Sequence, residues 1–245
     1  PDWLKRWVFV TFGKWFDPCP ANPGFDGLSI PWKKMNYVNP PFDEIGKWMD
    51  KASSELKKGN TSIFLIPFRA HTNYFLRNVS NIRCSMILDE EIAFKGYNRK
   101  LSIALHICVF SPHKIPRTIK GLSTQGISYV TDIDNLKELK KETRKICRDV
   151  TVIGSSLSQP LSELLKKKES RRDSFAVICP TRMSNKVLHS AFKDSTFMIF
   201  ANTHINSNRD HKFAQCVLLF GNVSPPKNMK TFQLHSLSVN QLKRK

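Results

Sequence analysis

The chain has 245 residues, 40% of them hydrophobic, which is enough to bury one large α/β core or two small ones and excludes an intrinsically disordered protein. Its 39 lysines and arginines outnumber its 20 aspartates and glutamates, and the formal net charge of +19 predicts attraction to a polyanion, most simply nucleic acid. Charge alone does not name the partner, and a basic ribosome-associated protein fits it as well.

The six cysteines occur singly, and no C-x-x-C or paired histidine spacing completes a metal site. The sequence therefore predicts no structural metal and a reducing, intracellular compartment, either cytoplasmic or nuclear. No apolar run approaches the roughly 18 residues that span a bilayer, so no membrane association is expected. Because the chain begins at Pro1, an excised targeting segment and an organellar location stay open.

Short apolar runs alternate with helix-like stretches along the first half of the chain. This alternation predicts parallel β-α-β units, and hence an α/β fold. Residues 43–58 carry apolar side chains at three- and four-residue spacing, which is typical of an amphipathic helix, with Asp43 as its expected cap and Gly59 as its expected end. Strands are expected near residues 15–18, 35–38, 61–67, 84–88 and 102–110.

The turn Asn39-Pro40-Pro41-Phe42 directly follows the second of these strands. An exocyclic amine on a base is a poor nucleophile, because its lone pair is delocalised into the ring. The side-chain oxygen of Asn39 and the carbonyl of Pro40 are placed to accept the two amine hydrogens, and Phe42 to stack on the ring. The two prolines fix φ and leave no N–H to compete for these oxygens. An ordinary strand-to-loop stop remains the alternative for such a short motif.

Other motifs surround this turn at characteristic places. Phe16-Asp17-Pro18-Cys19-Pro20 and Asp26-Gly27-Leu28 precede it, and the run L-x-P-x-R-x-x-T-x-x-F from Leu65 to Phe75 follows it. Over residues 1–112 this combination resembles the phage-type Dam-like DNA adenine methyltransferases. The resemblance implies a Rossmann-like S-adenosylmethionine-dependent methyltransferase fold and transfer of a methyl group to the exocyclic amine of adenine.

The resemblance also implies roles for individual residues. Asn39, Pro40, Pro41 and Phe42 would form the catalytic turn. The S-adenosylmethionine pocket would be lined by Phe16, Asp17, Pro18, Cys19 and, with a looser match, Asp26. The family often has Gly-Arg before a later phenylalanine, where this chain has Glu91-Ile92-Ala93-Phe94, and this departure puts the outer wall of the pocket in doubt. A glycine-rich loop is not required, because S-adenosylmethionine carries no phosphate.

Substrate-binding side chains are expected beyond the third strand. Arg69 is a candidate contact for a phosphate beside a flipped nucleotide, and Tyr74 for stacking, although an ordinary helix start fits both as well. The densest basic cluster contains Lys167 and Arg171 and is a candidate phosphate-binding face, with a solvated helix end as the alternative.

A stretch rich in Pro, Gly, Lys and Thr, residues 111–125, predicts a linker, so we divide the chain into a catalytic domain, residues 1–118, and a second α/β unit, residues 119–245. In the second unit, residues 135–148 and 157–169 are expected helices.

The second unit looks like a degenerate copy of the first. Residues 174–182 echo residues 62–69, including a P-x-R ending, and residues 216–220 echo residues 108–110. A second catalytic turn would fall at residues 154–157, which contain no proline and no amide. The second unit is therefore expected to be non-catalytic and either to bind nucleic acid or to complete the fold. Chance similarity between α/β segments is an equal alternative.

Three functions are compatible with the sequence. The leading hypothesis is an adenine-specific methyltransferase that flips its base out of nucleic acid, with DNA favoured over RNA by the resemblance alone. Enzymes that methylate glutamine amides or guanine amines use a similar turn, but usually together with a glycine-rich cofactor motif. A catalytically silent nucleic-acid-binding or ribosome-associated protein is the non-enzyme alternative. The oligomeric state is not predicted.

Overall fold

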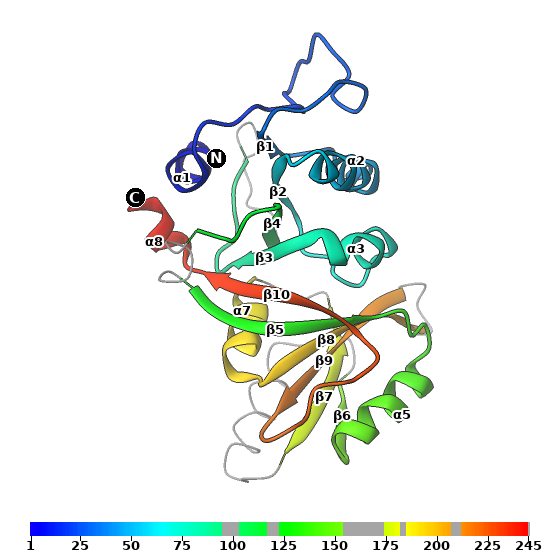
Figure 1. The fold of residues 1–245 in the computed structure, drawn as a ribbon. Helices are drawn as coiled ribbons and strands as arrows, with labels where there is room; N and C mark the ends of the chain where they lie inside the picture. Colours follow the sequence, from blue (N-terminus) through cyan, green and yellow to red (C-terminus); the bar gives the residue numbers. More distant parts are fainter. Residues whose placement is uncertain (95–102, 117–122, 154–173, 182–184, 207–211, 245) are drawn as a thin grey trace.

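The computed structural model describes residues 1–94, 103–116, 123–153, 174–181, 185–206 and 212–244. Within these ranges ten strands form one continuous sheet, with helices on both faces (Figure 1). The strands are β1 (Met35–Val38), β2 (Thr61–Pro67), β3 (Ile82–Leu88), β4 (Leu105–Phe110), β5 (Ser123–Thr131), β6 (Asp149–Val152), β7 (Phe175–Pro180), β8 (Phe197–Asn206), β9 (Lys212–Phe220) and β10 (Lys230–Leu237). The helices are α1 (Asp2–Phe12), α2 (Ile45–Lys57), α3 (Asn73–Asn78), the 3-10 helix η1 (Val79–Asn81), α5 (Leu136–Ile146), α7 (Asn185–Asp194) and α8 (Val239–Lys243).

This architecture confirms the α/β class, but the sheet is mixed and not a series of parallel units. The parallel neighbours are β1–β2, β3–β10, β5–β8 and β6–β7. In contrast, β4 runs antiparallel between β2 and β3, and β9 runs antiparallel between β7 and β8. A continuous apolar run indicates a strand that is buried on both faces, and it carries no information on the direction of that strand.

The strand order repeats from each end of the sheet to its centre. One end has the order β1-β2-β4-β3-β10, and the other has β6-β7-β9-β8-β5 with the same sequence of parallel and antiparallel neighbours. The last strand of the first set, β10, comes from the second part of the chain, whereas β5 comes from the same part as β6, β7, β8 and β9. At the centre β5 and β10 pair antiparallel, from Ser123↔Leu237 to Val130↔Lys230. Although β10 belongs to the second part of the chain, it pairs with β3 and completes the sheet of the first part. The division of the chain at residue 118 therefore stays a prediction.

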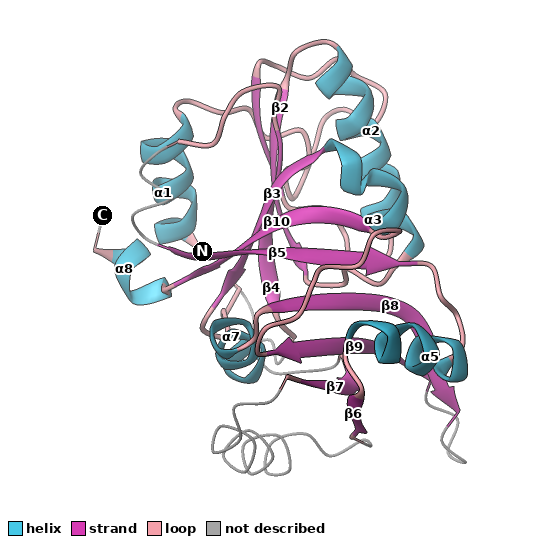
Figure 2. Ribbon diagram, turned by 60° about the horizontal axis from the view of Figure 1, so that its bottom comes forward, coloured by secondary structure: helices cyan, strands magenta, loops and turns pink. Residues whose placement is uncertain are grey.

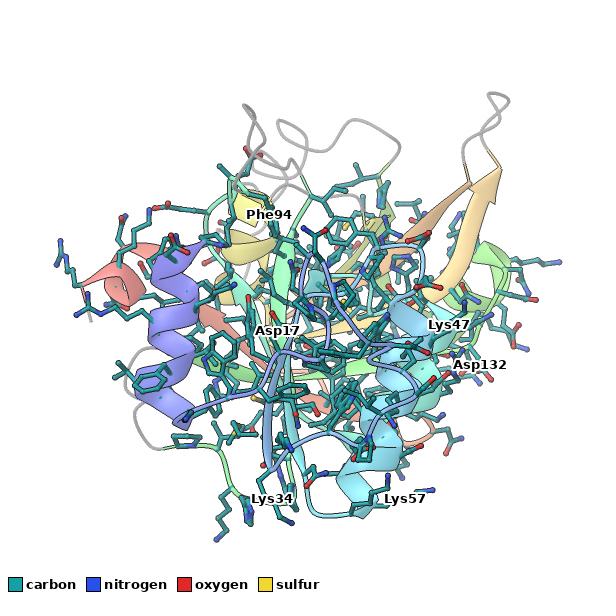
Figure 3. The ribbon with its side chains drawn as sticks, turned by 90° about the horizontal axis from the view of Figure 1, so that it is seen from above. Asp17, Lys34, Lys47, Lys57, Phe94 and Asp132 are labelled. Carbon is teal, nitrogen blue, oxygen red and sulfur yellow. The ribbon has the colours of Figure 1, made fainter. Side chains whose placement is uncertain are left out.

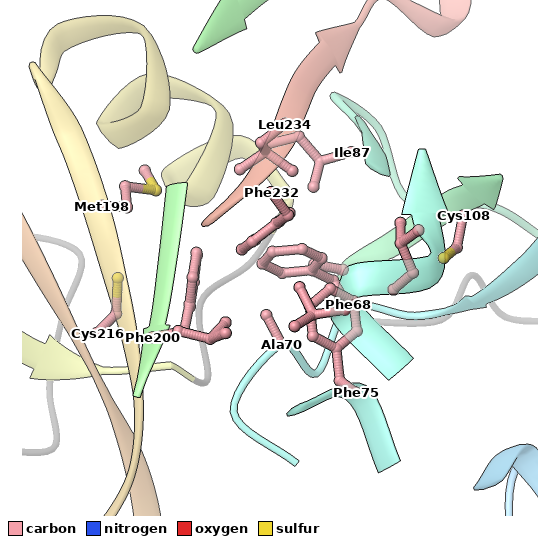
Figure 4. Packing of buried hydrophobic residues seen from close by; sticks show 14 of the residues in the cluster. Phe68, Ala70, Phe75, Ile87, Cys108, Met198, Phe200, Cys216, Phe232 and Leu234 are labelled. Atoms are coloured by element: carbon pink, nitrogen blue, oxygen red, sulfur yellow. The ribbon is translucent and has the colours of Figure 1, made fainter. Parts of the chain in front are cut away.

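The two faces of the sheet are covered differently. On one face a single apolar cluster extends over both ends of the sheet, beneath α2, α3 and α7. Its centre joins Phe68 to Phe200 and Phe75 to Phe232, at ring-centroid distances of 5.1 Å and 5.2 Å (Figure 4). On the other face α1 and α8 cover one cluster and α5 covers another (Figure 2). The sheet is therefore held together mainly through its shared apolar face.

Several expected elements are found where the sequence placed them. The strands at 35–38 and 61–67 are β1 and β2, and α2 ends at Gly59, whose φ of 79° suits glycine. Asn135 caps α5 by accepting a hydrogen bond from the Glu138 N–H. The prediction that Asp43 caps α2 is wrong: Glu44 holds the N-cap position without a side-chain bond, because Asp43 lies within the preceding turn.

None of the described helices is both long and apolar enough to cross a membrane.

His106 of β4 is fully buried in the shared cluster, with its ring centroid 5.1 Å from that of Phe68 and 6.1 Å from that of Phe75. Neither ring nitrogen has a hydrogen-bond partner within the described part of the chain. Burial lowers the pKa of His106 from 6.5 to about 3. Below pH 6.5 the unfolded state therefore binds a proton that the folded state excludes.

This burial predicts a loss of stability in mild acid. Between pH 7 and pH 5 the free energy of unfolding should fall by about 2 kcal/mol more in the wild type than in His106→Leu, since leucine has no proton to gain. Urea unfolding at the two pH values measures this difference. His113→Gln, at an exposed position, should keep the wild-type pH dependence. Equal pH dependence in the wild type and His106→Leu would contradict the prediction.

Candidate functional site

Three adjacent parallel segments end at one edge of the sheet. β1 pairs with β2 on one side, up to Val38↔Phe64. On its other side β1 forms a parallel bridge with Phe16, in which the Phe16 N–H donates to the Met35 carbonyl and the Tyr37 N–H donates to the Phe16 carbonyl, both at 2.9 Å. The expected strand at 15–18 is thus reduced to a single bridge. Open α/β sheets bind ligands at the carboxyl ends of their parallel strands.

The predicted residues emerge at this shared edge. Asp17 follows the bridge at Phe16, Asn39 follows β1, and Arg69 follows β2 by two positions. Asn39 therefore lies in the middle, with the expected cofactor loop on one side and the expected substrate contacts on the other. Three motifs that are separated in sequence by up to 50 residues thus belong to one edge of the fold.

The Asn39 turn has an unused acceptor. The Oδ1 atom of Asn39 is buried and has no hydrogen-bond partner among the described residues. The carbonyl of Pro41 accepts from the Glu44 N–H at 3.1 Å, whereas no described donor reaches the carbonyl of Pro40. Phe42 is 36% exposed, unusually open for a phenylalanine. Buried polar atoms are nearly always paired in native proteins, so the Asn39 oxygen is available to a ligand, and the exposed ring of Phe42 follows it by three positions in the chain.

The two loops expected to hold the cofactor contact one another. A methyl group built on Gly27 would lie 1.8 Å from the carbonyl oxygen of Pro18 and 2.9 Å from the Trp48 ring. The indole N–H of Trp32 donates to the Gly27 carbonyl at 2.7 Å, and the Trp32 and Trp48 rings stack at 6.1 Å. Only glycine fits here, and its contact joins the Asp17 loop to the Asp26 loop against α2.

Substituting Gly27 should therefore loosen both loops. Gly27→Ala is expected to destabilise the protein by about 1–3 kcal/mol, because the added methyl group overlaps backbone that cannot move independently. Gly24→Ala is the matched control, since a methyl group there meets nothing within 4 Å. Urea unfolding gives the stabilities, and near-ultraviolet circular dichroism monitors the Trp32–Trp48 pair. A Gly27→Ala protein as stable as Gly24→Ala would show that the two loops are not packed as described.

The first loop carries a partly buried carboxylate. Asp17 accepts the Cys19 N–H at 2.9 Å, and burial raises the pKa of Asp17 above its ordinary value even though this hydrogen bond opposes the shift. The pKa of Cys19 is raised to about 11, mainly by burial and further by the charges of Asp17 and Glu44. Seen from above, Asp17 lies between α1 and α2 (Figure 3). Glu44 is paired with Lys47 at 2.7 Å, so Asp17 is the carboxylate that this side of the edge offers to a cationic ligand group.

Aromatic rings lie beside this carboxylate. Phe16 and Phe25 stack at a ring-centroid distance of 6.1 Å, and Phe25 is 38% exposed. Burial, and to a smaller extent the charge of Asp17, also raises the pKa of Tyr37. Phe25 and Glu44 were missed by sequence reasoning. Glu44 carried a usable signal as an acidic residue before a helix, whereas nothing in the sequence marks Phe25.

Asp26 is placed differently from the expectation. Its carboxylate is exposed and accepts hydrogen bonds from the Leu28 N–H, at 2.9 Å, and from the Ser29 hydroxyl. These bonds, with that from Ser29 the larger cause, lower the pKa of Asp26. Asp26 therefore shapes its own loop, and a ligand would have to share this carboxylate with two existing donors.

On the other side of the turn, Arg69 and Tyr74 lie close together. The carbonyl of Arg69 accepts the Thr72 N–H at 3.0 Å and the Thr72 hydroxyl at 2.8 Å, which starts α3. Burial raises the pKa of Tyr74, and the nearby charge of Arg69 opposes this shift. A methyl group on Gly46 would lie 3.3 Å from the Tyr74 Cβ, so Tyr74 packs on the first turn of α2, beside the Asn39 turn.

The structure gives no placement for the remaining predicted residues. Lys167, Arg171, the helix at 157–169 and the expected second turn at 154–157 lie outside the described residues. A different group of exposed lysines lies at the opposite, amino end of β1, where Lys34 and Lys57 are found (Figure 3). In the described ranges no three His, Cys, Asp or Glu side chains come together as metal ligands.

A separate cavity of about 680 Å³ lies elsewhere, between α5 and residues 222–229. None of the predicted site residues lines it. Two of its three carboxylates are engaged, since Glu142 pairs with Lys145 at 2.6 Å and Glu138 accepts from Asn135 at 3.1 Å, whereas Asp132 is exposed. We therefore place the candidate site at the edge that carries Asn39. Comparison with protein-family models, curated proteins and solved structures gives no match to this chain.

Proposed function

We propose that this protein is an S-adenosylmethionine-dependent methyltransferase that acts on the exocyclic amine of adenine in nucleic acid, with DNA favoured over RNA. The observation that carries the proposal is the buried Oδ1 of Asn39 at the end of β1, to which no described residue donates a hydrogen bond. It lies between a carboxylate loop and a loop with an arginine, at an edge where α/β sheets bind ligands. The resemblance of residues 1–112 to the Dam-like family supports the same conclusion.

The turn would bind the base after it is flipped out of the stack. Asn39 Oδ1 and the Pro40 carbonyl would accept the two amine hydrogens, and Phe42 would cover the ring. Because neither oxygen gives up a protein partner, the acceptors are already oriented and binding needs no rearrangement. Held in this way, the nitrogen becomes more tetrahedral and its lone pair is available for attack.

The residues on the Asp17 side fit the proposed cofactor. The Asp17 carboxylate suits the ammonium group or the ribose hydroxyls, and the exposed ring of Phe25, stacked on Phe16, suits an adenine face. S-adenosylmethionine supplies an electrophilic methyl group on a sulfonium, so that an N–C bond forms as an S–C bond breaks. The methylated amine is cationic and loses its proton to water, so no general base is required from the protein.

We further propose that the β1-α2-β2 unit is the core of a Rossmann-like methyltransferase domain. The unit has two parallel strands, a helix between them and the turn at the carboxyl end of the first strand. The matching strand order at the other end of the sheet favours an internal duplication in which the second copy completes the fold. RNA adenosine methylation, or a silent nucleic-acid-binding role, is the alternative.

Cofactor binding tests this proposal. Titration calorimetry with S-adenosylmethionine should give one site per chain with micromolar affinity, and Asp17→Asn should weaken it by about tenfold, because the carboxylate loses its charge. Asp134→Asn, an exposed carboxylate far along the chain, is the matched control and should not change the affinity. If the folded wild type does not bind S-adenosylmethionine, the methyltransferase proposal is wrong and the silent nucleic-acid-binding role is favoured.

A further inference from the structure

The surface helix α5 presents lysine and arginine side chains along one face. Its Lys137, Lys140, Lys141 and Arg144 fall within an arc of about 100° around the helix axis, given 3.6 residues per turn. Lys140 is half-buried and the other three are exposed. The opposite side of the helix is apolar, and Leu139 is fully buried against the sheet. The packing of α5 therefore directs these four residues, here called the α5 stripe, to solvent.

Among the described residues, no carboxylate compensates the charge of the stripe by an ion pair. Both glutamates of α5 lie on its flank and are engaged, Glu142 with Lys145 and Glu138 with the cap residue Asn135. No described residue forms an ion pair with any of the four cations. α5 lies on the outer surface of the sheet and contacts β8 and β6 (Figure 2).

In the free protein, repulsion between these cations lowers the stability of α5. Lys137 and Lys141 are four residues apart, as are Lys140 and Arg144, and like charges at this spacing destabilise a helix by about 0.2–0.5 kcal/mol per pair. A solvated surface helix usually mixes both signs. A bound polyanion would turn this repulsion into attraction.

We infer that the α5 stripe is a contact surface for the phosphates of duplex DNA. Its four residues span about 10 Å along the helix, a length over which B-DNA carries roughly six phosphates. Contacts of this kind position the duplex without reading its sequence. The stripe belongs to the second part of the chain, so it would hold DNA that flanks the target and not the flipped base. The choice of DNA as the partner rests on the proposed function.

Binding of a short fluorescein-labelled DNA duplex to the full chain tests this inference. The variant Lys137→Gln, Lys140→Gln, Lys141→Gln, Arg144→Gln should bind at least about tenfold more weakly at low salt. The slope of log affinity against log salt should become shallower by about 3–4, because four phosphate contacts are lost. The matched control replaces Lys33, Lys34, Lys57 and Lys193 with glutamine, which removes the same charge from other exposed positions and should have a smaller effect.

Several outcomes would overturn the inference: an unchanged salt slope, equal losses in both variants, or a loss seen with single-stranded RNA and not with duplex DNA. The milder Lys137→Gln, Lys141→Gln variant should shift the slope by about half as much, and it provides the test if the fourfold variant unfolds. Calorimetry with S-adenosylmethionine separates this inference from the proposed function. If the stripe variant binds DNA more weakly but the wild type does not bind S-adenosylmethionine, the contact surface is supported and the methyltransferase proposal is wrong. If the wild type binds S-adenosylmethionine but the stripe variant binds DNA normally, the contact surface is wrong and the methyltransferase proposal is supported.

Discussion

Replacing Asn39 with alanine should lower the rate of methyl transfer by about 10²-fold or more, while leaving the fold and the affinity for nucleic acid unchanged. The substitution removes an acceptor that has no partner among the described residues, so the folded state loses no hydrogen bond. It would lose the group that holds the amine in its reactive geometry. Single-turnover transfer from labelled S-adenosylmethionine measures the rate, and urea unfolding measures the stability.

Two further variants define the role of this side chain. Asn39→Asp keeps an acceptor oxygen in the same place and should retain more activity than Asn39→Ala. Asn228→Ala, at an exposed position away from this edge, should be fully active. Full activity in a stably folded Asn39→Ala protein would show that the turn is a strand-to-loop connection and nothing more.

Removal of residues 228–245 should unfold the whole sheet. These residues form β10 and α8, and β10 is paired with β3 on one side and β5 on the other. The deletion also removes five side chains from the core and exposes the apolar residues that they cover. Each of the five is no more than 4% exposed: Phe232, Leu234, Leu237, Val239 and Leu242. At roughly 1.5–3 kcal/mol for each, the loss of about 8–15 kcal/mol equals the entire stability of a typical domain.

Circular dichroism and urea unfolding test this expectation. The shortened chain should lack a cooperative transition, and a synthetic peptide of residues 228–245 added in trans should restore one. Deletion of Arg244 and Lys245 alone, which follow α8, is the matched control and should leave the transition intact. A shortened chain with a cooperative transition would show that residues 1–227 do not depend on β10.

The secondary structure of the first half was predictable because local signals agree there. β1 and β2 are short and mostly apolar, with Asn36 inside β1 and Thr61 and Ser62 at the start of β2, and α2 has a clear helical period that is followed by a glycine. The pairing of strands was not predictable in the same way. β10 lies beside β3 although paired residues such as Ser85 and Leu234 are 149 positions apart in the chain, and no local pattern specifies such a partner.

The chemistry of the candidate site was easier to predict than its surroundings. The residue types in the Asn39 turn suggest amine recognition by themselves, and the parallel ends of the Phe16 bridge, β1 and β2 explain why Asp17, Asn39 and Arg69 share an edge. The local bonds that occupy Asp26 and the contact of Gly27 with Pro18 depend on the folded loops, so they could be found only in the structure.

Nucleoside analysis after incubation with labelled S-adenosylmethionine tests the central claim most directly. The full chain is incubated in parallel with duplex DNA, RNA and protein, and each substrate is hydrolysed and separated. We expect label in N6-methyladenine from DNA with the wild type, and none with Asn39→Ala. Label in another nucleoside or in protein, or no label in any substrate with the folded wild-type chain, would contradict the account.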